Sequence, residues 1–242
     1  GCVLQTGGSD QWGNLTSGID LIHKVEGGSA HAIGTPLITN SDGTKFGKSE
    51  GNAIWLDAQM CSPYRFSQFW LNTADADVIA RLKVFTFLSR AEIERLELAV
   101  ANEPFRREAQ RTLAREVTRL VHGDAATDAA FAAAEALFGQ GDLASLDEST
   151  LLAAIEELPV AREPEGTSVV EALVSTGLVA SGGEARRAIS QGGVYIDNVR
   201  VERDDAVLRS TLPGGIVVLR RGKRSLAGVI LSSELVVAHE LN

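Results

Sequence analysis

The spacing of apolar residues changes along the chain, and this change constrains the fold more than any other feature of the sequence. Residues 1–62 mix short apolar runs, which are typical of strands, with one stretch of helical spacing. Residues 63–138 are helical in pattern, and from Ser168 onward two helical stretches precede runs that are typical of strands. A chain of 242 residues suffices for one large domain or for two to three small ones, and the pattern favours several.

Start and stop signals sharpen the expected elements. Ser89 precedes an acidic first turn, which is typical of a helix N-cap, and Gly123 stands where another helix should end. Asp197 and Asn198 occupy a two-residue hairpin turn that requires positive φ, which both residue types tolerate. We expect helices at 11–25, 64–73, 75–87, 90–102, 104–122, 126–138, 168–176 and 182–191. We expect strands at 2–5, 35–39, 215–225 and 226–231, a hairpin at 193–201 and a loop at 40–52.

Charge is unevenly distributed along the chain. The formal net charge of −9 argues weakly against nucleic-acid binding over the whole surface. Residues 136–167 hold 7 acidic side chains and 1 basic one, and we interpret residues 139–167 as an acidic linker. Residues 186–224 hold 9 basic and 4 acidic side chains, so this part could still bind an anionic polymer.

Several classes of protein are disfavoured by composition. The two cysteines, Cys2 and Cys61, make a disulfide framework improbable and fit reduced thiols in the cytoplasm. The four histidines show no metal-ligand spacing, so we expect no protein metal site. No apolar run approaches the roughly 20 residues that a membrane-spanning helix needs, so we expect no membrane partner.

The stretch GGSDQWGN at residues 7–14 has a composition typical of a ligand-binding site at the end of a strand. Two glycines after a strand let a ligand approach the backbone, and a following helix directs free N–H groups at the same place. Asp10 could accept hydrogen bonds from ribose hydroxyls, and Gln11 could donate to a carboxyl or carbonyl group. The alternative, that Ser9 or Asp10 merely caps the helix, has about even weight, because such caps are common.

The stretch KFGKS at residues 45–49 places two lysines on a glycine-rich loop. Such a loop can close on the phosphates of a nucleotide as charge develops during displacement at phosphorus. It lacks the spacing of a Walker loop. A solvated surface turn is the alternative, and it would be favoured for a lysine pair with no other signal.

Two clusters of arginine suggest contact with a phosphate backbone. Arg107, Arg111, Arg115 and Arg119 share one face of a predicted helix, but pairing with nearby acidic residues makes a solvated face the favoured interpretation there. In the tail, Arg186 and Arg187 precede a hairpin and RRGKR follows at residues 220–224. A helix pair beside a small sheet with clustered guanidinium groups suits folded RNA, and the local clustering favours that interpretation over an ordinary basic surface.

Together these motifs resemble a known family. GGSDQWGN, DGTKFGKSEGNAIWLD and SPYRFSQFWLNT resemble the second half of bacterial tyrosyl-tRNA synthetases, which are class I aminoacyl-tRNA synthetases, and the resemblance covers nearly the whole chain. KFGKS is similar to the class I signature KMSKS. GGSDQWGN differs from the corresponding phrase of the related tryptophanyl enzymes, and the tail resembles an RNA-binding module shared with a ribosomal small-subunit protein.

The resemblance implies a fold and an activity. Residues 1–62 would be the α/β C-terminal part of a Rossmann-like catalytic domain, residues 63–138 an all-α anticodon-binding domain, and residues 168–242 a small α+β RNA-binding domain of the ribosomal S-four type, after the linker 139–167. The activity would be that of a tyrosine–tRNA ligase, which activates L-tyrosine with ATP and transfers the tyrosyl group to the 3′ end of its tRNA. Magnesium would accompany ATP, and the complete protein would form a homodimer.

The resemblance also implies roles for single residues. Asp10 would hold the ribose of ATP and of tyrosyl-adenylate, Gly8 would leave room for the nucleotide, and Gln11 would position the tyrosine carboxylate. The loop residues that would bind the leaving pyrophosphate are Lys45, Lys48 and Ser49, with Lys48 also binding ATP. The residues that would contact tRNA are Arg186, Arg187, Arg220, Arg221, Lys223 and Arg224.

The chain departs from the family pattern at several points. No HIGH signature occurs in it, so we expect that this chain alone cannot activate tyrosine. In the tail, Gly182 and Asn198 replace residues that are often Arg and Gly; Gly182 removes a positive charge, whereas Asn198 should preserve the turn. The alternatives are a stand-alone RNA-binding module derived from a synthetase, which the intact Asp10, Gln11, Lys45 and Lys48 disfavour, and a tryptophanyl enzyme, which GGSDQW and the tail disfavour.

Overall fold

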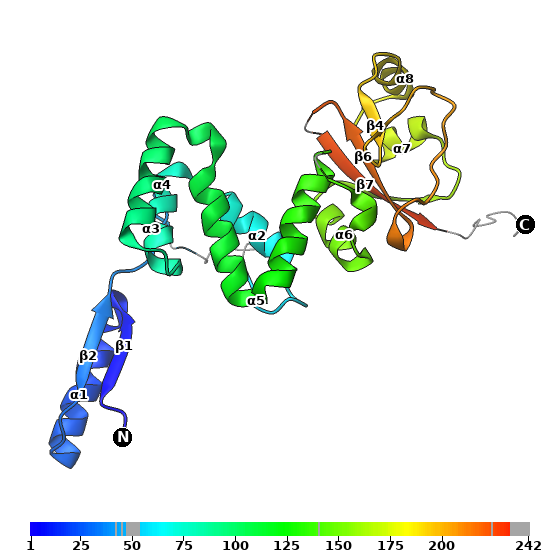
Figure 1. The fold of residues 1–242 in the computed structure, drawn as a ribbon. Coiled ribbons are helices and arrows are strands. Elements are labelled where there is room, and N and C mark those ends of the chain that lie inside the picture. The colour runs from blue at the N-terminus through cyan, green and yellow to red at the C-terminus, as the bar shows by residue number, and fades with distance from the viewer. Residues whose placement is uncertain (42, 45, 47–53, 140, 224, 233–242) are drawn as a thin grey trace, which may run out of the picture. The chain divides into compact units, whose positions relative to one another are not determined.

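The computed structural model describes residues 1–232 except 42, 45, 47–53, 140 and 224. The chain forms two compact units, Gly1–Ile54 and Trp55–Asn242. The first unit contains strands and a helix, and the second contains helices followed by a sheet. Figure 1 colours the elements in chain order.

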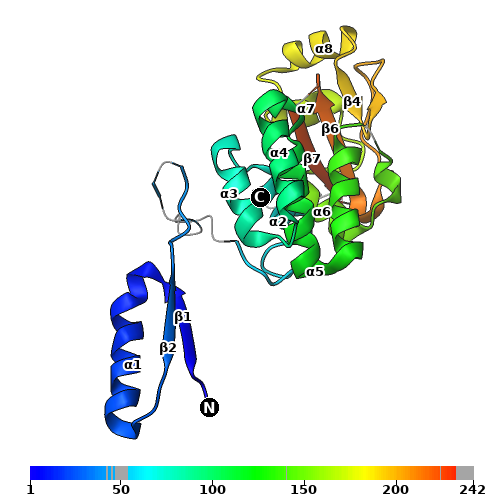
Figure 2. The same ribbon diagram turned by 60° about the vertical axis from the view of Figure 1, so that its left-hand side comes forward.

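The first unit is a strand–helix–strand crossover. Strands β1 (Leu4–Gly8) and β2 (His31–Thr35) pair in parallel, with Leu4 opposite His31 and Gly8 opposite Thr35. Helix α1 (Trp12–Glu26) connects them and lies along the pair, as Figure 2 shows. It ends at Gly27, whose φ of 64° suits glycine, so the helix predicted at 11–25 is confirmed.

The strand predicted at 35–39 is wrong in position. The strand lies four residues earlier, at His31–Thr35, and it ends where Pro36 begins. Proline has no N–H group to donate to a neighbouring strand, so the ladder stops there. The apolar side chains Leu37 and Ile38 misled the prediction, because both are exposed rather than buried in a sheet.

The second unit begins with four helices. They are α2 (Pro63–Leu71), α3 (Asp75–Phe85), α4 (Arg90–Asn102) and α5 (Glu108–Leu137). Ser89 forms the expected capping box, since its hydroxyl accepts from the Glu92 N–H while the Glu92 carboxylate accepts from the Ser89 N–H. The core side chains of this part include Phe66, Trp70, Leu82, Leu96 and Leu113.

Helix α5 covers most of the two helices predicted at 104–122 and 126–138. Gly123 breaks it, with φ 81° and ψ 173°, as the sequence indicated. Its start differs from the prediction: Pro104–Arg106 forms a 3-10 turn, and Arg107 takes the left-handed conformation with φ 51°. The α-helix therefore begins at Glu108 rather than at Pro104.

The second unit ends in a five-stranded sheet with the order β3-β7-β6-β4-β5. Its strands are β3 (Val160–Pro164), β4 (Val194–Ile196), β5 (Val199–Arg200), β6 (Ile216–Arg221) and β7 (Ser225–Ser232). Among the described pairs of this sheet, β3–β7 is parallel and the others are antiparallel. Asp197 and Asn198 form the β4–β5 turn with φ values of 47° and 66°, so the predicted positive-φ turn is confirmed.

Both faces of this sheet are covered. Helices α7 (Val169–Ser175) and α8 (Gly182–Ser190) contribute to a core with Val217 and Leu219 of β6. Helix α6 (Glu148–Ile155) and the end of α5 contribute to a second core with Ile216 and Val218. Successive residues of a strand point to opposite faces, so the continuous run IVVL contributes side chains to both cores.

Two predictions for this part need correction. Residues 139–167 are not a linker, because they form α6 and β3, and Leu151, Ala154 and Ile155 are fully buried. The seven acidic side chains of this segment stand out in the sequence, but none of them is buried, and the apolar side chains between them form the buried face. The strand predicted at 215–225 ends at Arg221, because Gly222 turns the chain into β7 with φ 64°.

Candidate functional site

The stretch GGSDQWGN lies at the carboxyl edge of the parallel strand pair. Gly7 and Gly8 end β1, Ser9–Gln11 forms a 3-10 turn, and α1 follows. The hydroxyl of Thr35, at the end of β2, donates to the Gly7 carbonyl at 3.2 Å, which ties the two strand ends together. Ligands of open α/β sheets bind at this edge, beyond the carboxyl ends of the strands.

Asp10 folds back over Gly8. A Cβ added at Gly8 would lie 2.8 Å from Asp10 Oδ1 and 3.0 Å from Leu37 Cδ2, so a residue with a side chain would displace the carboxylate. The Asp10 carboxylate is exposed, and within the described part of the chain it accepts no hydrogen bond. Its acceptor oxygens are thus available to hydroxyl donors of a ligand.

The capping alternative finds no support in the geometry. The N-cap of the 3-10 turn is Gly8 and that of α1 is Gln11, and neither makes a side-chain cap hydrogen bond. Neither Ser9 nor Asp10 therefore caps α1. The Trp12 N–H donates to the Ser9 carbonyl of the 3-10 turn, and no described side chain caps the helix, so its positive end lies at the strand edge without a neutralising side chain.

Gln11 is held by a side chain that the sequence analysis did not single out. Asn14 Nδ2 donates to Gln11 Oε1 at 2.9 Å, across the first turn of α1. Its spacing of three residues on a helix was the signal that could have identified it. Trp12 packs against Gly34 of β2, where an added Cβ would meet the indole ring at 3.2 Å, so this contact seats the start of α1 on the strand pair.

The KFGKS residues Lys45, Lys48 and Ser49 lie outside the described residues, so their predicted roles stay predictions. The described residues just before them form a turn. The Asn40 N–H donates to the Thr44 carbonyl and its side-chain amide donates to the Thr44 hydroxyl, both at 2.8 Å. Phe46 N–H donates to the Ile38 carbonyl at 3.1 Å.

The prediction of four arginines on one helix face is wrong for Arg107, which precedes α5 in a left-handed conformation; the other three lie on α5. Arg107 donates to the carbonyl groups of Leu71 and Thr73 at the end of α2. Arg115 pairs with Asp128 at 2.8 Å. Arg119 pairs with acidic residues on both sides, Glu116 at 3.2 Å and Asp124 at 2.7 Å. These contacts agree with the solvated face that the sequence favoured.

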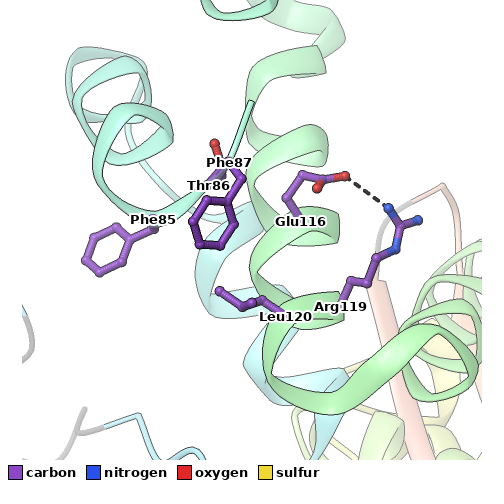
Figure 3. A pocket seen from close by; sticks show the side chains of 6 residues that line it. All are labelled: Phe85, Thr86, Phe87, Glu116, Arg119 and Leu120. Carbon is purple, nitrogen blue, oxygen red and sulfur yellow. Dashed lines mark hydrogen bonds and ion pairs between the residues drawn. The ribbon is translucent and has the colours of Figure 1, made fainter. Parts of the chain in front are cut away.

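A shallow hollow lies beside Arg119, where the end of α3 and the residues after it meet α5. Figure 3 shows the Glu116–Arg119 ion pair on α5 and Phe87 beside Leu120. Phe87 is 92% exposed and Leu120 is 60% exposed, so the hollow presents apolar side chains to solvent. Its lining contains no titratable cluster beyond that one ion pair.

The arginines of α8 remain exposed at the surface of the second unit. Arg187 forms no ion pair with any described residue, whereas Arg186 Nε lies 3.5 Å from the carboxylate of Asp204. A groove beside them is lined by both arginines, by Ile189 and Ser190, and by residues 202–205. This groove combines guanidinium groups with carboxylates, so its charge is mixed rather than purely positive.

The structure separates the arginines of RRGKR. Arg221 donates to the Leu178 carbonyl and pairs with Glu184, both at 2.7 Å. Arg220 points to the other face of β6, where its guanidinium lies 3.9 Å from the centre of the Tyr195 ring. Lys223 is exposed in the following turn. Arg224 lies outside the described residues, so its predicted role has no structural description.

Arg200 is a further exposed guanidinium that the sequence analysis missed. It lies against Gly192, where an added Cβ would come within 1.7 Å of its terminal nitrogen. Gly192 also has a φ of 70°, so only glycine suits this position. Nothing in the local sequence marks this contact, because the pairing of β4 with β5 creates it.

Within the residues that the structure describes, no group of three or more His, Cys, Asp and Glu side chains could hold a metal ion. No described helix has the length and apolar character needed to cross a membrane. Burial raises the pKa of the Cys61 thiol, which disfavours a thiolate nucleophile there.

Comparison with known families adds to this geometry. The family described as tRNA synthetases class I (W and Y) matches residues 2–139, which is more than half of the chain. This chain belongs to the class I tRNA synthetases of the tryptophan and tyrosine group. A second family, the tyrosine–tRNA ligase SYY-like C-terminal domain, matches residues 151–228 of this class I synthetase chain.

The similar proteins lie on the tyrosine side of the family. A tyrosine–tRNA ligase of Leifsonia xyli subsp. xyli is 67% identical over 233 residues, which cover 96% of this chain and 53% of the relative. A tyrosine–tRNA ligase of Streptomyces coelicolor is 53% identical over 232 residues, covering 95% and 55%. The predicted resemblance to tyrosyl-tRNA synthetases is confirmed, and the chain spans about half the length of these curated relatives.

One solved structure among the matches is a C-terminally truncated Aspergillus nidulans mitochondrial tyrosyl-tRNA synthetase. It is 34% identical in sequence, and the match covers 54% of this chain and 38% of that one. The TM-score is 0.46.

Proposed function

We propose that this chain forms part of a tyrosine–tRNA ligase, which activates L-tyrosine with ATP and transfers the tyrosyl group to the 3′ end of its tRNA. The observation that supports this most directly is the arrangement at the end of β1. There Gly8 leaves room for Asp10, and Gln11 stands at a helix start that no side chain caps. The 67% identity to a tyrosine–tRNA ligase supports the assignment of these residues to ATP and tyrosine.

In the activation step the tyrosine carboxylate attacks the α-phosphorus of ATP, and pyrophosphate leaves. Asp10 accepts hydrogen bonds from the ribose hydroxyls, and the side-chain amide of Gln11 donates to the tyrosine carboxylate. The N-terminus of α1, which no side chain caps, adds a positive potential at the same edge, where negative charge accumulates. Fixing these groups in advance lowers the entropic cost of bringing the two substrates together.

Lys45, Lys48 and Ser49 bind the departing pyrophosphate as their loop closes, in this proposal. Two ammonium groups offset the charge that develops on the bridging and terminal oxygens. Magnesium accompanies ATP as its counter-ion. The described residues offer no cluster of protein ligands for it, so we assign no step to the metal.

We assign three domains to the chain. Residues 1–62 form the C-terminal part of a Rossmann-like catalytic domain, and residues 63–138 form an all-α anticodon-binding domain. Residues 168–242 form a small α+β RNA-binding domain of the S-four type. The sheet of this last part continues into β3, so residues 139–167 belong structurally with it.

The tRNA would lie against the exposed cations of this last domain. Arg186, Arg187 and Lys223 are exposed there, and Arg200 adds a guanidinium on the neighbouring hairpin. Arg220 and Arg221 have partners within the protein, so they contribute to the positive potential more than to direct contacts. The complete protein is proposed to be a cytoplasmic homodimer, and a stand-alone RNA-binding module is the competing function.

The experiment that tests the proposal is ATP–pyrophosphate exchange by the complete protein, with tyrosine or tryptophan as the amino acid. Exchange should depend on tyrosine and not on tryptophan. Lys48→Ala should lower the exchange rate at least tenfold, because a charge that stabilises the transition state is lost. It should leave tRNA affinity within twofold, whereas Arg186→Ala should weaken tRNA binding and spare exchange.

A matched lysine controls for loss of charge alone. Lys24 lies exposed on α1 and pairs with Asp20 at 2.6 Å, away from the strand edge, so Lys24→Ala should leave both readouts unchanged. Equal rates for Lys48→Ala and the unmodified protein would overturn the loop assignment. RNA binding without any amino-acid-dependent exchange in the complete protein would favour the stand-alone RNA-binding module instead.

A further inference from the structure

Asn14 and Gln11 form a side-chain pair at the start of α1. Gln11 is the N-cap residue, and Asn14 follows three residues later in the first turn. Asn14 Nδ2 donates to Gln11 Oε1 at 2.9 Å, and both residues are exposed at the edge where β1 ends. The two side chains thus bond each other, and neither caps an N–H group of the helix; the Trp12 N–H donates to the Ser9 carbonyl instead.

The pair gives the Gln11 amide a direction. A glutamine side chain has an oxygen that only accepts and an NH₂ group that only donates. Because the oxygen is bonded to Asn14, the NH₂ group is the end left for a ligand, and it has no acceptor among the described residues. The positive end of α1 also favours the oxygen, rather than the NH₂ group, on the helix side.

Other polar side chains in this turn satisfy themselves differently. Thr16 donates to the carbonyl groups of Trp12 and Gly13, and Ser17 donates to the carbonyl group of Gly13 at 2.8 Å. These are ordinary bonds back along the helix. The Asn14 side chain instead bonds the side chain at the site, so its contact is directed at Gln11 and not at the helix backbone.

We propose that Asn14 is a positioning residue that holds the Gln11 amide with its NH₂ group toward the carboxylate of the amino-acid substrate. This inference rests on the proposed function, in which Gln11 donates to that carboxylate. A carboxylate only accepts hydrogen bonds, so only one of the two amide orientations serves it. Asn14 therefore acts on tyrosine through Gln11 and touches no substrate itself.

The sharpest test reverses the amide. In Asn14→Asp, residue 14 can only accept, so Gln11 turns its NH₂ group toward the new carboxylate and presents its oxygen to the substrate. We expect kcat/KM for tyrosine in ATP–pyrophosphate exchange by the complete protein to fall at least tenfold. The change should lie mainly in the KM for tyrosine, with the KM for ATP within twofold. Asn14→Ala, which frees the amide without reversing it, should cost about two- to tenfold, the usual range for one neutral hydrogen bond.

Two controls separate orientation from charge. Ser17→Asp adds the same negative charge one turn further along α1, on an exposed side chain with no contact to Gln11, and should change kcat/KM less than twofold. In a Gln11→Ala background, Asn14→Asp should also have less than a twofold effect, because no amide remains to be oriented.

The outcomes are distinguishable. Equal losses in Asn14→Asp and Ser17→Asp would overturn the inference in favour of a simple charge effect, while leaving the proposed function intact. An undiminished effect of Asn14→Asp in the Gln11→Ala background would overturn it as well. If Gln11→Ala itself left kcat/KM for tyrosine unchanged, the proposed role of Gln11 would fail, and the inference with it.

Discussion

Arg187 and Arg221 have equivalent places in the sequence-based prediction of RNA contacts, but the structure predicts opposite phenotypes for their loss. Arg187 is exposed and forms no ion pair with a described residue. Arg221 donates a hydrogen bond to the Leu178 carbonyl and forms an ion pair with Glu184. We expect Arg187→Ala to weaken RNA binding and leave stability unchanged. We expect Arg221→Ala to lower the free energy of unfolding and to affect RNA binding less.

The size of the stability effect follows from the two contacts of Arg221. The hydrogen bond to the Leu178 carbonyl contributes about 1 kcal/mol, the usual net value for a protein hydrogen bond. The Arg221 and Glu184 side chains are 36% and 31% exposed, so screening limits their ion pair to roughly 1 kcal/mol. The expected loss in Arg221→Ala is thus about 2 kcal/mol. Arg221→Lys keeps the charge but not the two-pronged geometry, so it should lose about 1 kcal/mol.

Two measurements check this reasoning. Urea unfolding should show a lower midpoint for Arg221→Ala at an unchanged m-value. Binding of the cognate tRNA across a salt series should show that Arg187→Ala reduces the slope of log K against log salt by about one, as expected when one phosphate contact is lost. Equal salt slopes for Arg187→Ala and the unmodified protein would refute the contact. An unchanged urea midpoint in Arg221→Ala would refute the structural role of the ion pair.

Two further predictions concern stability. Asn198 Nδ2 donates to the Ala136 carbonyl at 2.7 Å from a left-handed backbone, so Asn198→Gly should lose about 1 kcal/mol for the bond, and Asn198→Ala about 2 kcal/mol with the added backbone strain. Equal urea midpoints for these two variants would contradict the strain argument. Hydrogen bonds from Ser149 and Thr150 lower the pKa of Asp147, the N-cap of α6, to about 2, below its ordinary 3.8. A lowered folded-state pKa gives stability that is present above pH 4 and is lost as the pH falls toward 2, so the roughly 1 kcal/mol cost of Asp147→Ala should be full at pH 6 and shrink at pH 2 in urea titrations. A cost that does not change with pH would show that the carboxylate charge is irrelevant to the cap.

Local signals predicted the helices well and the strands less well. Ser89, Gly123 and the Asp197–Asn198 turn each act through the backbone of their immediate neighbours, and the structure confirms all three. The strand predicted at 35–39 failed because its apolar residues Leu37 and Ile38 lie beyond Pro36, after β2 has ended, and both are exposed. Strand positions depend on a partner distant in sequence, which a local pattern does not contain.

In the candidate site, too, local patterns predict some residues, whereas others depend on contacts between residues distant in sequence. Asp10 and Gln11 were identified from their place after two glycines, because that pattern needs only a strand end and a helix start. Arg200 was missed because its position depends on the pairing of β4 with β5 and on the bare face of Gly192. Arg220 and Arg221 were grouped as neighbours in sequence, whereas the alternation of a strand places them on opposite faces.

The sequence by itself determined the family, the helix boundaries set by caps and glycines, and the residues at the end of β1. These features depend on residue type and on contacts within a few positions along the chain. Only the tertiary structure decided that residues 139–167 complete the sheet and its second core, because apolar side chains from α5, α6 and β6 are buried there together. It also decided which arginines remain exposed, since a guanidinium group is available to RNA only where no carbonyl or carboxylate of the fold has already bound it.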